Sequence, residues 1–79
     1  MTTKEALTEA LTIAERRAAI EAGYILDETK ALENAWTPDA AVGAARAIAD
    51  YRAEMTKWTT TAAEIRRVLD NLDPTVEIR

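Results

Sequence analysis

The sequence predicts an all-α protein, a helical hairpin of two long helices, and three observations support this prediction. Ala makes up 17 of the 79 residues, whereas Gly and Pro occur only twice each, so the chain is poor in turn formers. A single proline with capping residues divides the chain near its middle. Apolar residues recur at helical spacing in both halves.

The first half is predicted to be an amphipathic helix that begins near Thr3. One apolar stripe consists of Leu7, Leu11, Ala14, Ala18, Ile25, Leu32 and Ala35. A second set widens it and consists of Ala6, Ala10, Ile13, Ile20, Tyr24 and Ala31. Together they cover roughly 160° of the helix, which is broader than a two-helix contact needs. This face is therefore expected to meet more than one neighbour.

Gly23 leaves two interpretations of this helix open. One helix, straight or kinked, runs over residues 3–35 and tolerates Gly23 at about 1 kcal/mol relative to Ala. Alternatively, the helix breaks at residues 23–26 and Asp27 caps a short helix over 28–35. We favour the single helix.

The second helix has clear start and stop signals. Thr37 is a suitable N-cap, Pro38 suits the first helical position, and Asp39 adds negative charge in the first turn. Pro74 pushes the residue before it out of the helical region, so the helix is expected to end near Leu72. A helix over residues 38–72 is about 50 Å long.

The apolar residues of this second helix keep a heptad spacing along its whole length. The a positions are Ala41, Ile48, Met55, Ala62 and Leu69, and the d positions are Ala44, Tyr51, Trp58, Ile65 and Leu72. Polar residues such as Arg52, Glu54 and Arg66 flank them. A repeat of about 3.5 residues predicts left-handed, nearly parallel packing against another helix.

The domain organisation follows from these elements. Residues 1–74 are predicted to form one hairpin domain, with a helix over about 3–35, a turn at 36–37 and a helix over about 38–72. Residues 75–79 are predicted to form an extended C-terminal tail, either frayed or docked on a partner.

Composition argues against catalysis and against several partner classes. The chain has no Cys, His or Ser, so the usual nucleophile–base pairs and the commonest zinc ligands are missing. We therefore expect no enzyme, and no catalytic, cofactor-binding or metal-binding residues. The net charge of −4 does not suit nucleic acid, and no apolar run reaches the roughly 20 residues of a membrane span. We also expect no small-molecule substrate.

Protein partners remain as the expected ligands. Two Ala-rich helices bury little apolar area for about 70 ordered residues, so we expect the hairpin to be completed as a bundle by self-association or by a partner. The predicted interface residues are Ile48, Tyr51, Met55, Trp58, Ile65, Leu69, Leu72 and Trp36. Core packing within the hairpin is the competing explanation for the Tyr51–Met55–Trp58 cluster. Trp36, in the turn, either caps the bundle end or stands exposed as an anchor.

The layout resembles the WxG family of small hairpin proteins exported by type VII secretion. The resemblance rests on residues 32–36 at the turn, which end in Trp36, and on the second helix from Lys57-Trp58 to Leu72. It implies a dimeric four-helix bundle exported without a signal peptide. This chain has Pro38 where the family has Gly, and it lacks the family's Tyr-and-acid export pattern after the second helix.

The expected function is that of a non-catalytic helical assembly protein, acting as a homo-oligomer or as an adaptor in a larger complex. Bacteriophage structural and accessory proteins are often small, acidic helical chains of this kind, which suggests virion assembly as the setting. The alternatives are a secreted WxG-like hairpin dimer and a small acidic inhibitor or anti-defence protein. The N-terminus lacks an apolar signal region, so we expect synthesis in the cytoplasm, followed by incorporation in a virion or signal-less export.

Overall fold

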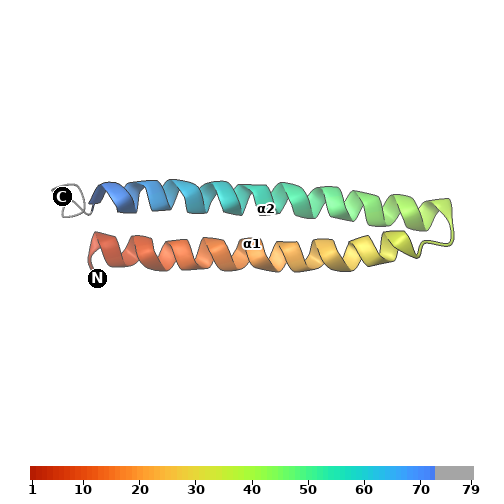
Figure 1. The fold of residues 1–79 in the computed structure, drawn as a ribbon, viewed down its shortest axis with the longest axis horizontal. Coiled ribbons are helices and arrows are strands. Elements are labelled where there is room, and N and C mark those ends of the chain that lie inside the picture. Colours follow the sequence, from red (N-terminus) through yellow and green to blue (C-terminus); the bar gives the residue numbers. More distant parts are fainter. Residues whose placement is uncertain (73–79) are drawn as a thin grey trace.

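The computed structural model describes residues 1–72, which form two helices, α1 (Thr3–Glu33) and α2 (Pro38–Leu72). The helices lie side by side in opposite directions and are joined by a short turn, so the N-terminus lies near the end of α2 (Figure 1). The predicted all-α hairpin of two long helices is therefore confirmed. The extended tail expected at residues 75–79 lies outside the described residues.

Helix α1 begins with a reciprocal capping box. The Thr2 hydroxyl accepts a hydrogen bond from the Glu5 backbone N–H at 3.1 Å, and the Glu5 carboxylate accepts one from the Thr2 backbone N–H at 2.8 Å. From there α1 continues through Gly23 without interruption. Of the two interpretations of the first half, the single helix is the one that the structure shows.

The C-terminal end of α1 differs from the prediction by two residues. The helix was expected to reach Ala35, but it ends at Glu33. Asn34 is the C-cap, and its side-chain amide donates to the Lys30 carbonyl at 2.8 Å. The backbone N–H of Asn34 also donates to the Lys30 and Ala31 carbonyls, so both groups of this residue close the last turn of the helix, earlier than its apolar spacing suggests.

Helix α2 starts where its sequence signals indicate and continues to Leu72, the last of the described residues. The Thr37 hydroxyl accepts from the Ala40 backbone N–H at 3.1 Å, and Pro38 is the first helical residue.

Threonine side chains within the helices also form local hydrogen bonds. The Thr61 hydroxyl donates to the Lys57 carbonyl at 2.8 Å, which keeps a polar side chain satisfied on the helix surface.

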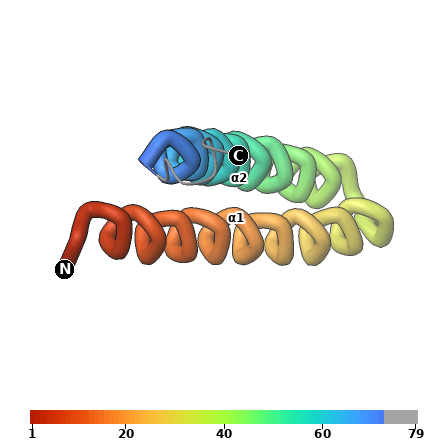
Figure 2. Tube along the Cα trace, turned by 60° about the vertical axis from the view of Figure 1, so that its left-hand side comes forward, coloured from red at the N-terminus to blue at the C-terminus, as the bar shows by residue number. Residues whose placement is uncertain are grey.

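The hairpin is a single layer of two helices with a thin core. Its extents are 60 × 25 × 14 Å. Figure 2 shows, from a second direction, that α1 and α2 lie alongside each other without being strictly parallel. Within residues 1–72 the buried apolar side chains are Ala14, Ala44, Ile48 and Ala62, and none larger than these is fully enclosed.

Candidate interaction surface

The predicted interface residues of α2 form the side of that helix that faces α1. Ile48 is buried, and its neighbours along the seam are half-buried, namely Tyr51, Met55, Trp58, Ile65 and Leu69. The structure thus brings six of the eight predicted residues together. Leu72, at the helix end, is 44% exposed. Trp36, in the turn, is 96% exposed and does not pack on the end of the hairpin.

The matching row on α1 contains acidic residues that the predicted stripe passed over. Ala14 and Glu21 are both buried, and Glu28 is half-buried. These positions keep the alternating spacing of three and four residues that joins Ala14 to Ile25. Strict heptad spacing was the signal that could have found them, but a search for apolar residues alone skips a glutamate. The side-chain stem of a glutamate therefore packs in the helix–helix contact.

Aromatic and cationic groups gather along one side of the seam. The rings of Tyr24 and Tyr51 lie 5.0 Å apart at 38°, and the Arg17 guanidinium lies 5.5 Å from the centre of the Trp58 ring. The Trp58 indole N–H is buried and has no hydrogen-bond acceptor within residues 1–72. Both contacts join α1 to α2, so they fix which sides of the two helices adjoin.

This side of the hairpin is the more apolar one, and we call it the Tyr24 face. Its residues are Ile13, Ile20 and Tyr24 of α1 with Tyr51, Trp58, Val68 and Leu72 of α2. Ile13 is 56% exposed and Tyr24 is 46% exposed. Exposed apolar side chains gathered on one face often mark a site of association with another protein. The α1 residues belong to the broad apolar face predicted for that helix, and the Tyr24–Tyr51 contact places this face beside α2.

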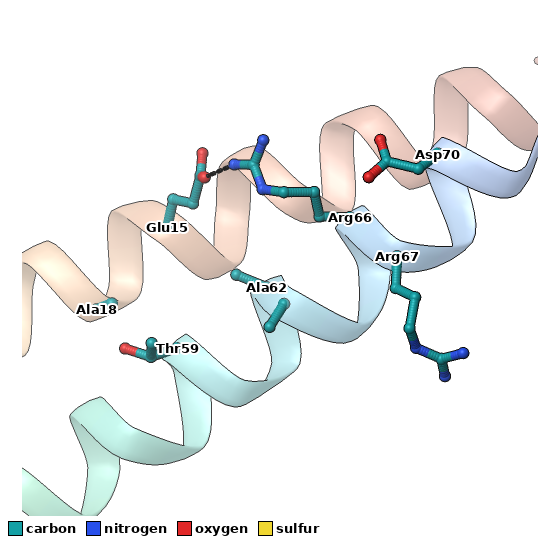
Figure 3. Close-up of a pocket in the computed structure, with 8 residues that line it drawn as sticks. Glu15, Ala18, Thr59, Ala62, Arg66, Arg67 and Asp70 are labelled. Carbon is teal, nitrogen blue, oxygen red and sulfur yellow. Dashed lines mark hydrogen bonds and ion pairs between the residues drawn. The ribbon is translucent and has the colours of Figure 1, made fainter. Parts of the chain in front are cut away.

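The opposite side of the seam is polar. With about 100° of rotation per residue, Glu15 and Arg17 fall on opposite sides of Ala14. Glu15 accepts a hydrogen bond from Arg66 across the helices, and both side chains are more than half exposed. Figure 3 shows this pair above a shallow groove of about 550 Å³, which includes Ala18 and Ala62 in its lining. Small side chains on both helices leave this space open.

Comparisons of the chain with protein-family models, with curated proteins and with solved structures gave no match. Neither α1 nor α2 has a segment both long and apolar enough to cross a membrane. Within residues 1–72 no three acidic side chains are grouped to hold a metal ion. The surface itself is therefore the basis for a functional proposal.

Proposed function

We propose that this chain is a non-catalytic helical assembly protein that works as a homo-oligomer. The observation that supports the proposal is the contrast between its core and its surface. Three of the four buried apolar side chains are alanines, whereas Ile13, Ile20 and Tyr24 are each at least 39% exposed. Several large apolar side chains therefore lie on the surface of the hairpin, while its buried core is made mostly of alanine.

The balance between apolar burial and conformational entropy in a small chain also supports self-association. Burial of apolar area stabilises a fold by about 25 cal/mol per Å², and ordering each residue costs about 1–2 kcal/mol, so a two-helix layer without large buried side chains is marginal. Association of helical hairpins into a four-helix bundle covers the exposed row and adds the missing core. Self-association thus gives the chain both its stability and its function as an assembling unit.

The test is the solution mass measured over a range of protein concentrations, combined with thermal unfolding. We expect a multiple of the 8.7 kDa chain mass and a midpoint temperature that rises with concentration, because association stabilises only the folded state. A strict monomer at all concentrations, with a sharp unfolding transition, would contradict the proposal.

A secreted WxG-like hairpin is the second candidate, and the exposed Trp36 at the turn favours it. A tryptophan that is 96% exposed at the tip of a hairpin is available as an anchor for another protein. The two candidates differ in their genetic setting. Genes for capsid, portal or tail proteins beside this one favour virion assembly, whereas a neighbouring secretion ATPase favours export.

A further inference from the structure

The α1 side of the Tyr24 face is a second heptad row, displaced by one residue from the row that packs on α2. Its members alternate in spacing between three and four residues and are Ala6, Ala10, Ile13, Arg17, Ile20, Tyr24, Asp27 and Ala31. A row of this period is a surface for packing another helix. Because the hairpin is one layer, 14 Å thick, no element within residues 1–72 covers this row.

Helix α2 carries a corresponding row on the same face of the hairpin. It consists of Ala40, Ala44, Ala47, Tyr51, Glu54, Trp58, Thr61, Ile65, Val68 and Leu72. Ala44 is buried in the seam, and Tyr51, Trp58 and Ile65 are half-buried there, so these four belong to the row only by their edges. The Tyr24–Tyr51 and Arg17–Trp58 contacts place this row beside that of α1. The face therefore presents two neighbouring heptad rows, one on each helix, to another pair of helices.

We propose that a second copy of this chain covers the Tyr24 face, with α1 packed antiparallel on α1 of the partner and α2 on α2 of the partner. This inference rests on the proposed self-association. It adds which face of the hairpin is covered, the two-fold symmetry of the dimer, and the residues that lie opposite each other. The hairpin extends over 60 × 25 Å on its broad side, an outline within which an interface burying roughly 800 Å² on each partner can fit.

The charges on the α1 row are self-complementary about Ala22. Arg17 and Asp27 have opposite signs and lie five residues on either side of it. A two-fold axis at this level sets Arg17 opposite the partner's Asp27, twice over, and Ile20 opposite the partner's Tyr24. A two-fold interface requires such a surface, on which residue i meets j and residue j meets i.

The neighbouring registers that heptad packing allows are worse. One of them sets Arg17 opposite the partner's Ile20, which desolvates the guanidinium against an apolar side chain. The other sets Asp27 opposite the partner's Tyr24 and moves Arg17 away from any acid. Only the register centred on Ala22 pairs both charges of the row while it also pairs two of the largest apolar side chains.

The α2 row is compatible with the same level. Since Tyr24 lies beside Tyr51 and Arg17 beside Trp58, Ala22 lies beside Ala53. Antiparallel heptad packing of the α2 row on itself has one register centred between Arg52 and Ala53, within about half a residue of that level. This register pairs large with small side chains: Trp58 meets the partner's Ala47, and Ile65 meets the partner's Ala40. Glu54 meets the partner's Tyr51, whose hydroxyl can donate to it.

A charge-reversal experiment tests the register. In the proposed dimer, position 17 of each chain faces position 27 of the other. Asp27→Arg therefore places two positive charges in each of these two pairs, and Arg17→Asp places two negative charges in each of them. Each variant alone should raise the dissociation constant of the dimer by about tenfold, whereas an equimolar mixture should associate as tightly as the wild type, since both pairs become attractive. Circular dichroism checks that each variant remains helical.

Spin-label distances test the symmetry in the otherwise unchanged protein, which has no native Cys to remove. Glu9→Cys and Arg16→Cys occupy the same heptad position and are both exposed. In the proposed dimer the Glu9 pair is separated by about 39 Å along the bundle and the Arg16 pair by about 18 Å, at 1.5 Å per residue. We therefore expect the distance for Glu9→Cys to exceed that for Arg16→Cys by about 15–20 Å.

The outcomes separate this inference from the function on which it rests. Equal distances for the two labels, or charge variants that bind like the wild type, overturn the antiparallel register but leave self-association intact. A mass other than that of a dimer also overturns the register. A wild-type chain that is monomeric at every concentration overturns both proposals.

Discussion

At the scale of single residues, the two glycines lie in helices that do not require them. Neither Gly23 nor Gly43 has a positive φ, and a Cβ built at either position meets nothing within 4 Å. Neither glycine therefore serves close packing within the hairpin, and each leaves the unfolded chain with extra conformational freedom.

We expect Gly23→Ala to raise the free energy of unfolding by about 1 kcal/mol, because Ala has the higher helix propensity and the site has room for its methyl group. Urea denaturation measures the change. The reverse substitution Ala19→Gly, at an exposed position of the same helix, is the matched control and should lower stability by a similar amount. A Gly23→Ala protein less stable than the wild type would indicate a contact at this position in the assembled state.

Glu21 is the residue whose burial is hardest to reconcile with stability. It is 6% exposed, and no Lys or Arg of residues 1–72 lies within ion-pair distance of its carboxylate. Its side-chain stem packs between the helices, at a position where an apolar side chain would gain more from burial.

We expect Glu21→Leu to raise the free energy of unfolding by about 1 kcal/mol, since Leu places a larger apolar side chain at a buried heptad contact position. Thermal or urea unfolding measures it. Glu9→Leu, at an exposed position, is the control and should change stability by less than about 0.5 kcal/mol. A loss of stability in Glu21→Leu would show that the carboxylate is compensated in the assembly.

At the scale of the helices, both N-termini are defined by side-chain caps. Thr2 and Glu5 close the start of α1, and Thr37 closes the start of α2. Hydrogen bonds from the Thr2 backbone and side chain lower the pKa of Glu5 below its usual value of 4.5. The ionised carboxylate is therefore favoured in the folded helix more than in the unfolded chain.

The sign of the pH dependence follows from this lowered pKa. The capping contribution of Glu5 is fully present above about pH 4.5 and is lost as the pH falls through the lower folded value. We expect Glu5→Gln, whose amide oxygen can still accept from Thr2, to keep the cap and to reduce the loss of helicity in acid. Circular dichroism between pH 6 and pH 2 measures this difference. Identical acid profiles for the two proteins would mean that the Glu5 carboxylate does not contribute.

At the scale of the whole molecule, one tryptophan packs between the helices and the other is exposed to solvent. Trp58 lies in the seam beneath Arg17, whereas Trp36 is 96% exposed at the turn. We expect Trp58→Ala to lower the free energy of unfolding by about 2–3 kcal/mol, because a large half-buried side chain is removed from the helix contact. Trp36→Ala should leave stability within about 0.5 kcal/mol of the wild type.

Tryptophan fluorescence follows unfolding in each single variant, since each keeps one indole. A Trp58→Ala protein as stable as the wild type would mean that the α2 seam contributes little to the fold. Destabilisation by Trp36→Ala would instead show that the turn is covered in the oligomer. In both variants the oligomer mass distinguishes loss of folding from loss of association.

Much of the fold could be predicted because it depends on local signals. The N-cap Thr37 with Pro38, and the proline after α2, mark helix bounds through short-range steric and hydrogen-bonding rules, and α2 has the bounds that they indicate. The end of α1 could not be predicted this way. Asn34 caps the helix two residues before the apolar spacing stops, and spacing alone does not reveal a side-chain cap.

The sequence by itself determined which residues share a face of each helix, because periodicity is set by the geometry of a single helix. It therefore indicated both the α2 seam and the broad face of α1. Only the tertiary structure decided which faces meet. The antiparallel direction and the hairpin register bring Tyr24 to Tyr51 and Arg17 to Trp58, and they bury Glu21 despite its charge. Those pairings depend on the relative position of two helices far apart along the chain, which no local pattern encodes.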